Sequence, residues 1–356
     1  MFTHQPAARS LTRFAALDLL RYLASIMVAT YHWTLEIGVD RSLSVYKIPI
    51  LGDFIKNGSL GVQIFFIISG YVIFETAQSR TSFGFLFARF KRLIPGLLIS
   101  MTIVFFIGSR FVHSYSEPLK SFLTSITLSF QYFDVQPLAT QLWTLVIEIK
   151  FYFLIFLFLL CIPKVFKSRL LLLIFLFIWC LIQYVPNSSY SFVMNILEFL
   201  RLDDNAKYFI LGALINLMTS LARKEILEHC LMFIIALPVL YLIFPNGFTG
   251  FRDLVLLCSI IVIFLCNKIH FSKKVSKLSY WLGLSSYLIY LLHAHLGVAI
   301  LLQLQDRITS NIFFLVSFTL LALTQLSLML ALYVEKPLQK SLDFQSFSKK
   351  LSRFKT

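Results

Sequence analysis

The stretch LDLLRYLASIMVATYHW, residues 17–33, has the apolar content of a membrane-spanning helix but carries two ionisable residues, Arg21 and His32. A transmembrane helix needs about 20 predominantly apolar residues, and an ionisable side chain inside it is costly and commonly functional. With about 100° of rotation per residue, these two side chains differ by only about 20° around a helix, so they share one face. The stretch therefore predicts a membrane fold with a polar site inside it.

The rest of the chain is as apolar as this first stretch. Of its 356 residues, 58% are hydrophobic and only 14% are charged, which is more apolar than a soluble domain. We predict an all-α fold: a polytopic transmembrane helix bundle of about ten spans with no soluble domain. The predicted spans are residues 15–35, 58–77, 93–112, 142–162, 169–185, 207–221, 229–245, 252–266, 280–302 and 311–333.

The remaining segments complete the predicted organisation of the chain. The short apolar stretch 119–133 is predicted to be interfacial or re-entrant. Residues 1–340 are predicted to form one transmembrane domain, and residues 341–356 a basic cytoplasmic tail. No small-residue cleavage site follows the first span, so we expect a retained helix rather than a removed signal peptide. The five cysteines lie in apolar spans without metal-ligand spacing, so we predict no metal site.

The net charge of +15 is distributed unevenly between the loops. If both termini are cytoplasmic, 21 of the 32 lysines and arginines lie in segments on that side, and only 7 lie in loops on the other side. This bias follows the positive-inside rule, so it indicates orientation in a membrane rather than binding to nucleic acid. We predict a multi-pass protein of the plasma membrane, the inner membrane in a bacterium, with both termini in the cytoplasm.

Each ionisable residue of the first span has a structural alternative to a functional role. Asp18 lies three residues before Arg21 and can pair with it, whereas an arginine near the inner end can also simply extend to the interface. His32 lies between Tyr31 and Trp33, so it could belong to an interfacial aromatic belt. Ionisable residues at the same depth in other spans favour a functional role.

Two other predicted spans carry such residues in the outer half of the bilayer. The fourth span places Glu148 there, with Tyr152 one turn away, and the ninth span places His293 there. A carboxylate beside an imidazole is a general-base arrangement, so we predict that Glu148 orients His32 in a shared polar cavity. Three unrelated helix–helix hydrogen bonds are the alternative.

Two further motifs suggest binding of a donor molecule. GVQIFFIISGYVIF places Ser69 and Gly70 in the middle of a span, where small residues let an acyl chain or another backbone approach closely; ordinary helix packing is the alternative. In FLFARFKRLIPG, Arg89 and Arg92 share a helix face and can clamp a polyanion, although they could also act only as a positive-inside anchor.

Together, these motifs resemble the acyltransferase-3 family of integral membrane O-acyltransferases, some of which acetylate bacterial surface polysaccharides. The resemblance extends from Leu17 to about Pro337. It rests on Arg21 followed by His32 and on GVQIFFIISGY, RFKRLIP, WTLVIEIKFY and SYLIYLLH, in an order and spacing that together are specific.

The resemblance implies a role for each matching residue. His32 is the implied catalytic histidine, with Arg21 essential beside it and Glu148 as the motif carboxylate. The implied acyl-CoA site contains Arg89, Arg92, Ser69 and Gly70, and the residues expected elsewhere in the pocket are Asp18, Trp143, Tyr152, Tyr287 and His293.

The resemblance also implies the reaction and its partners. An acyl group, expected to be acetyl, moves from cytoplasmic acyl-CoA to a hydroxyl of a surface glycan or lipid-linked glycan at the lipid bilayer. Acyl-CoA is then a donor substrate, and no permanently bound cofactor is expected. Some relatives carry a fused esterase-like domain, which we do not expect here because the chain ends about twenty residues after its last span. A transporter or flippase, and a non-catalytic scaffold of the same fold, are the alternatives.

Overall fold

The computed structural model describes residues 8–36, 51–111, 116–186, 191–220, 226–308 and 311–342. Within these ranges every regular element is a helix, so the predicted all-α fold is confirmed. Apolar segments of a membrane protein form helices because a helix satisfies all its interior backbone groups within the segment, where no water is available.

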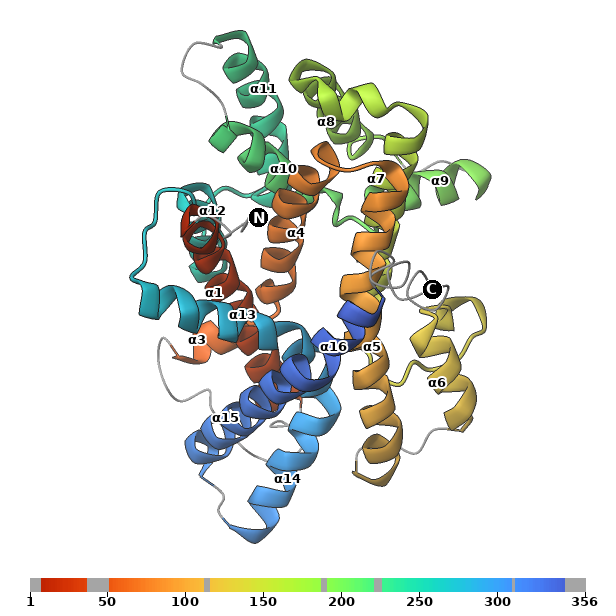
Figure 1. Ribbon diagram of the computed structural model, residues 1–356, viewed down its shortest axis with the longest axis vertical. Helices are drawn as coiled ribbons and strands as arrows, with labels where there is room; N and C mark the ends of the chain where they lie inside the picture. The colour runs from red at the N-terminus through yellow and green to blue at the C-terminus, as the bar shows by residue number, and fades with distance from the viewer. Residues whose placement is uncertain are drawn as a thin grey trace, which may run out of the picture. The chain divides into compact units, whose positions relative to one another are not determined.

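The helices follow one another along the chain, as Figure 1 shows. In chain order they are α1 (Ala8–Tyr31), η1 (His32–Glu36), α3 (Leu51–Lys56), α4 (Leu60–Gln78), α5 (Ser82–Phe111), α6 (Pro118–Ile126), η3 (Phe130–Tyr132), α7 (Leu142–Cys161), η4 (Pro163–Lys167), α8 (Arg169–Ile182), α9 (Ser191–Arg201), α10 (Ala206–Ser220), α11 (Ile226–Ile243), α12 (Phe251–Leu265), α13 (Lys273–Leu292), η5 (His293–Gly297), α14 (Val298–Arg307), α15 (Ile312–Leu330), η6 (Ala331–Glu335) and α16 (Lys336–Ser341). Three of them, η1, η5 and η6, are π-helical.

All ten predicted spans fall on helices, but those helices differ in length. Among the described residues, five helical stretches are long and apolar enough to cross a membrane: Leu60–Gln78, Ser82–Ile107, Leu142–Cys161, Lys273–Arg307 and Ile312–Ser341. Three more predicted spans coincide with shorter apolar helices, Arg169–Ile182, Ala206–Thr219 and Glu228–Ile243. At about 1.5 Å per residue these fall short of the roughly 30 Å hydrocarbon core. The two remaining predicted spans, residues 15–35 and 252–266, coincide with α1 and α12.

The segments between predicted spans contain helices as well. The stretch 119–133 forms α6 and η3, which are too short to cross a bilayer, as an interfacial or re-entrant segment would be. The sequence did not predict α3 or α9, because neither is apolar enough over its length to resemble a span. The predicted tail lies almost wholly beyond residue 342, outside the described residues.

The chain forms two compact units, each assembled from separated segments. Unit 1 comprises Met1–Ala24, Ser59–Leu86 and Val146–Ser279, and unit 2 comprises Ser25–Gly58, Phe87–Leu145 and Tyr280–Thr356. The prediction of a single domain over residues 1–340 stays a prediction.

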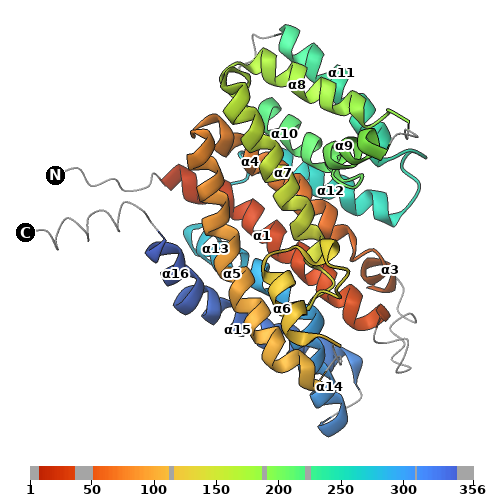
Figure 2. The ribbon, with the colours of Figure 1, turned by 90° about the vertical axis from the view of Figure 1, so that its right-hand side faces the viewer.

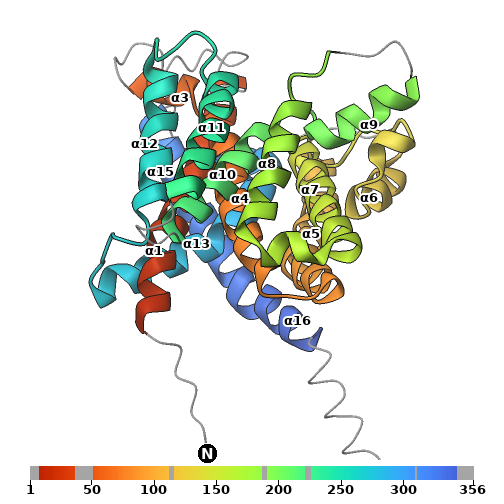
Figure 3. The same ribbon diagram turned by 90° about the horizontal axis from the view of Figure 1, so that it is seen from above.

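Unit 1 is organised around the contact between α4 and α10, which lie side by side in Figures 1 and 3. Two glycines make this contact possible. A Cβ atom at Gly70 would overlap the carbonyl oxygen of Phe209, and a Cβ atom at Gly212 would overlap that of Ile67. The close approach of a second backbone at Gly70 is therefore ordinary small-residue helix packing, the alternative that the sequence left open.

An aromatic cluster fills the space beside this contact. The ring of Phe151 lies 4.2 Å from the ring of Phe209 and 6.0 Å from that of Trp179, measured between centroids. The ring of Phe74 also stacks with that of Phe151, with centroids 6.2 Å apart. Because such rings bury large apolar areas, the cluster joins α4, α7, α8 and α10 into one core.

Unit 2 is held by polar side chains that connect α13 to its neighbours. The amide of Gln141 donates to the carbonyl oxygen of Leu291 at 2.7 Å, and the hydroxyls of Thr144 and Tyr290 are 2.8 Å apart. Tyr287 donates to the carbonyl oxygen of Leu93 in α5 at 3.0 Å. Figure 2 shows α6 alongside the later part of α5, where the rings of two phenylalanines lie 5.0 Å apart.

Replacing Gly70 with serine should destabilise the protein, because the new side chain would force α4 and α10 apart. Overpacking a well-packed site costs about 1–3 kcal/mol, so the midpoint of thermal denaturation in detergent should fall. Gly250→Ser is the matched control, since a Cβ atom there meets nothing within 4 Å and serine suits the N-cap position that Gly250 holds before α12. Equal midpoints for Gly70→Ser and the wild-type protein would contradict the close helix contact.

Candidate active site

The predicted catalytic histidine lies next to another histidine. In unit 2, the rings of His32 and His293 have centroids 5.0 Å apart and planes inclined by 42°. His32 is the first residue of the π-helix η1, and His293 is the first residue of the π-helix η5. Such π-helical turns are rare and occur frequently at functional sites. The structure thus brings together two of the residues predicted from separate spans.

Trp33 holds the two π-helices against each other. Its side chain is completely buried, and its indole N–H donates to the carbonyl oxygen of His293 at 2.9 Å. The indole ring lies where a side chain at position 297 would be, since a Cβ atom on Gly297 would come within 2.9 Å of Trp33 Nε1. From the sequence alone Trp33 appears only as a neighbour of His32 in an aromatic belt, because a partner 260 positions away leaves no local signal.

His293 has one ring nitrogen bonded and one without a partner. Its Nδ1 donates to the carbonyl oxygen of Tyr290 at 2.7 Å. The side chain is 0% exposed, and Nε2 has no hydrogen-bond partner among the described residues. A buried polar atom left in this state is uncommon and calls for a functional explanation.

The predicted pair at the start of the first span is confirmed. Arg21 Nη1 lies 3.5 Å from Asp18 Oδ1 in unit 1, and both side chains are 19% exposed. Spacing of three residues places the two groups on one helix face, and the pairing lowers the cost of burying the guanidinium group.

Glu148 belongs to a second polar cluster, in unit 1. Its Oε1 accepts a hydrogen bond of 2.5 Å from the Tyr152 hydroxyl and one of 3.3 Å from Ser69 Oγ. Tyr152 follows one turn later in α7, and Ser69 comes from α4. Three residues that the sequence assigned to the site are therefore in contact. The predicted orientation of His32 by Glu148 joins residues of different units, and it stays a prediction.

The two arginines of the predicted donor site differ in exposure. Arg92 is exposed, whereas Arg89 is partly buried, although both lie in α5. The charge of Arg92 interacts with that of Glu335, a residue of η6 that is only 4% exposed. Glu335 Oε1 accepts from the Gln339 amide at 2.9 Å. The sequence gives no sign of a role for Glu335, because this residue follows the last predicted span, where an acidic residue is common.

The other predicted pocket residues have different surroundings. Tyr287 packs against Gly96, and its hydroxyl donates a hydrogen bond to a backbone carbonyl oxygen of α5. Tyr287 therefore connects α13 to α5 in unit 2. The side chain of Trp143 is 43% exposed. The roles predicted for Tyr287, Trp143, Ser69 and Gly70 in binding substrate stay predictions.

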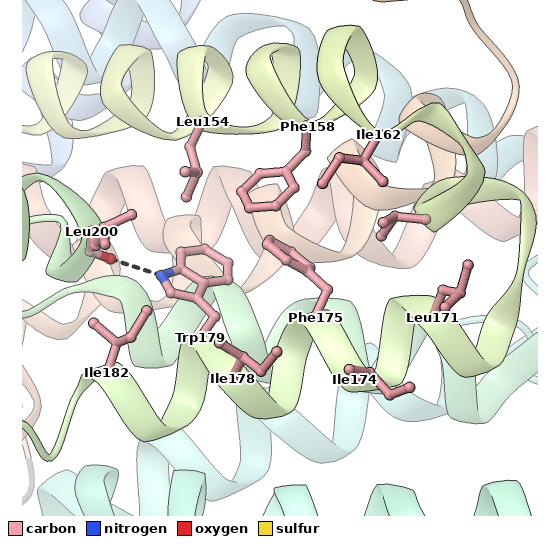
Figure 4. A pocket seen from close by; sticks show the side chains of 11 residues that line it. Leu154, Phe158, Ile162, Leu171, Ile174, Phe175, Ile178, Trp179, Ile182 and Leu200 are labelled. Carbon is pink, nitrogen blue, oxygen red and sulfur yellow. Dashed lines mark hydrogen bonds between the residues drawn. The ribbon is translucent and has the colours of Figure 1, made fainter.

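A groove in unit 1 has the wrong chemistry for the reaction. It encloses about 220 Å³ between α7 and α8 and is lined by apolar side chains, among them Leu154, Phe158 and Phe175 (Figure 4). The indole N–H of Trp179 in its wall donates to the carbonyl oxygen of Leu200 at 2.7 Å. A groove without acidic, basic or nucleophilic groups can accommodate hydrocarbon but cannot activate a reacting atom.

Comparison with known proteins identifies a family and a relative that covers part of the chain. Residues 14–334 match the Acyl_transf_3 family model, described as an acyltransferase domain. The chain is 32% identical over 176 residues to peptidoglycan O-acetyltransferase OatA of Listeria monocytogenes. This similarity covers 43% of the chain and only 25% of the length of OatA. No solved structure matches the chain.

Replacing Tyr152 with phenylalanine should destabilise unit 1, because Glu148 would lose its shortest hydrogen bond. Hydrogen bonds to charged groups contribute about 1.5–3 kcal/mol, so the denaturation midpoint in detergent should fall. Tyr132→Phe is the matched control, since Tyr132 is 85% exposed and should tolerate the same change. If both variants denature like the wild-type protein, the Tyr152 hydroxyl contributes nothing to stability.

Proposed function

Because the chain belongs to the acyltransferase-3 family, we propose that it is a membrane O-acyltransferase using cytoplasmic acyl-CoA, with acetyl as the transferred group. The acceptor in this proposal is a hydroxyl of a surface glycan or lipid-linked glycan. The similarity to OatA supports O-acetylation, and its printed name supports a glycan acceptor. The observation that carries the proposal is a histidine pair, partly buried His32 and completely buried His293, inside the span of the acyltransferase domain.

The proposed reaction needs a base for the acceptor hydroxyl. A sugar hydroxyl holds its proton far above neutral pH, so a positioned imidazole contributes to catalysis by removing that proton in the transition state. His32 takes the proton while the hydroxyl oxygen forms a bond to the thioester carbonyl carbon. The carbon–sulfur bond then breaks, and the departing thiolate takes the proton from the His32 imidazolium and leaves as a thiol. In this proposal Glu148 supplies the carboxylate of the site, and Arg21 stabilises the oxyanion or the donor phosphate.

The donor site proposed at α5 follows from the charge of coenzyme A. Its phosphates suit an exposed guanidinium group, which binds phosphate through two parallel hydrogen bonds. Arg92 is exposed and Arg89 lies three residues before it on the same helix face, so both are proposed to bind the donor. The charge bias of the loops supports a cytoplasmic position for this end of α5 and a cytoplasmic position for both termini.

His32→Ala should abolish transfer while leaving the amount of protein in the membrane near that of the wild type. Loss of a general base lowers rate by about 10²–10⁴-fold. The measurement is acyl-CoA consumption by isolated membranes together with mass spectrometry of surface glycans. His270→Ala is the matched control, because His270 is an exposed histidine outside the polar clusters. A transporter or scaffold would consume no acyl-CoA in any variant, and substantial activity in His32→Ala would exclude His32 as the base.

Arg92→Lys should weaken donor binding more than it slows turnover. Lysine keeps the charge but lacks the planar fork, so a lost charge-assisted hydrogen bond should raise the KM for acyl-CoA. The expected loss is about 1–3 kcal/mol. Arg307→Lys is the control, since Arg307 is exposed in α14 on the other predicted side of the membrane. An unchanged acyl-CoA saturation curve for Arg92→Lys would leave Arg92 with only an anchoring role.

A further inference from the structure

We propose that unit 1 binds an anionic phospholipid of the predicted cytoplasmic leaflet, with its phosphate in a polar pocket and one acyl chain in the groove between α7 and α8. The pocket is formed where α4 ends, α5 begins and η4 follows α7. This site goes beyond the proposed function, because lipid binds there whether or not the chain transfers an acyl group.

The polar pocket encloses about 430 Å³ and carries positive charge. Its lining includes the cations Arg80 and Lys167 together with the hydroxyl residues Ser79, Thr81 and Ser82. No carboxylate is among the described residues that line it. Guanidinium, ammonium and hydroxyl groups all donate hydrogen bonds to phosphate oxygens, and the two cations add charge attraction. The pocket is therefore suited to a phosphate group.

Both cations of the pocket are available to a ligand. Arg80 and Lys167 are exposed, and neither has an ion-pair partner within the part of the chain that the structure describes. Elsewhere in unit 1, by contrast, Lys150 pairs with Asp203 at 2.9 Å. Two positive charges that line one cavity repel each other, and an anion placed between them replaces this repulsion with attraction.

The backbone of the pocket adds to the effect of these cations. Thr81 and Ser82 lie at the start of α5, a helix of 30 residues, whose N-terminal N–H groups and dipole attract negative charge. The Thr81 hydroxyl accepts a hydrogen bond from the N–H of Gly84 at 3.2 Å, which holds the turn between α4 and α5 in place. The helix end thus strengthens a site that two side-chain charges already define.

The η4 turn connects the polar pocket to the apolar groove. Pro163, Phe166 and Lys167 line the pocket, whereas Ile162 and Val165 line the groove. Because residues of the two linings alternate along one short 3₁₀ turn, the pocket and the groove lie on adjoining sides of it. A ligand that carries both a phosphate and a hydrocarbon chain can therefore occupy both.

The groove has the chemistry of a site for an acyl chain. Phe175 and Trp179 in its wall are buried, whereas Ile162, Ile174 and Ile178 are each about half exposed (Figure 4). Exposed isoleucines along helices of a membrane protein contact hydrocarbon rather than water, so the groove opens toward the lipid. Lipid chains are the hydrocarbon available there.

The predicted orientation places the pocket at the depth of phospholipid headgroups. Arg80 lies between the second and third predicted spans and Lys167 between the fourth and fifth, which are both cytoplasmic segments by the charge distribution. Anionic lipids give the cytoplasmic leaflet a negative surface potential that attracts basic residues. A phospholipid accounts for the pocket and the groove together, whereas a soluble phosphate accounts only for the pocket.

Removing the charges of the pocket should weaken binding of anionic lipid. Dioleoylphosphatidylglycerol should raise the denaturation midpoint of the full-length protein in detergent, because a ligand that binds only the folded state stabilises it. Dioleoylphosphatidylcholine should act only at higher concentrations, since the two cations repel its choline group. In Arg80→Gln/Lys167→Gln, the phosphatidylglycerol concentration for half the effect should rise about tenfold or more, as expected for a lost charge-assisted hydrogen bond.

A double substitution elsewhere controls for the loss of two charges. Lys273→Gln/Lys274→Gln removes two exposed cations at the start of α13, on the same predicted side of the membrane. This variant should respond to phosphatidylglycerol like the wild-type protein, because neither lysine lines the pocket.

Filling the groove should weaken binding of the same lipid from its other end. Ile174→Trp places a large ring where the acyl chain is proposed to lie. Leu170→Trp is the matched control, since Leu170 lies on the same helix and is equally exposed but does not line the groove. Native mass spectrometry of protein extracted from vesicles of equal phosphatidylglycerol and phosphatidylcholine counts the retained lipid, so a variant with a low denaturation midpoint is still informative.

The outcomes that would overturn the proposal are distinct. Equal effects of the two lipids, or unchanged phosphatidylglycerol binding in either Arg80→Gln/Lys167→Gln or Ile174→Trp, would exclude an anionic phospholipid at this site. Stabilisation by inorganic phosphate or coenzyme A that is lost in Arg80→Gln/Lys167→Gln would assign the pocket to a soluble phosphate instead. Acyl-CoA consumption enters none of these measurements, so failure of the proposed function is recognised separately.

Discussion

A polar group inside a membrane helix finds no water to bond with, and the arrangement of both polar clusters follows from that constraint. The junction of α13 and η5 shows its effect most clearly. Carbonyl oxygens there accept hydrogen bonds from the Trp33 indole, the Gln141 amide and the ring of His293. These donors come from η1, from the turn before α7 and from η5 itself. The hydrogen bonds that satisfy these carbonyl groups therefore also hold η1, which begins with His32, against η5.

The same constraint acts on unit 1 in a different way. A carboxylate in an apolar helix needs strong donors, and Glu148 has two hydroxyl donors, from Tyr152 and Ser69. Ser69 can reach it because α4 is held in place by its close contact with α10 at Gly70 and Gly212. The small residues of α4 thus affect the Glu148 cluster indirectly. Gly70 sets the distance between the two helix backbones, and the adjacent Ser69 is thereby held within hydrogen-bond distance of Glu148.

Local periodicity was sufficient for the features that lie within one helix. Apolar length located the helices of all ten predicted spans, since burial in hydrocarbon depends on composition over about 20 residues. Helical spacing was also sufficient for the Asp18–Arg21 pair and for the contact between Glu148 and Tyr152. Apolarity alone did not determine helix length, because α8 begins at Arg169 and ends at Ile182, before the turn at residues 183–185.

The sequence by itself determined the helical class, the family resemblance and the residue types available for acyl transfer, because these depend on composition and short motifs. Only the tertiary structure decided which side chains meet. His293 lies beside His32, and Glu335 lies close enough to Arg92 for their charges to interact. Neither contact produces a periodic pattern in the sequence. The π-helical turns η1, η5 and η6 add a further reason, since they depart from 100° per residue at His32, at His293 and just before Glu335. Many apolar helices can pack together in similar ways, so the partners of a polar side chain emerge only when the helices are assembled.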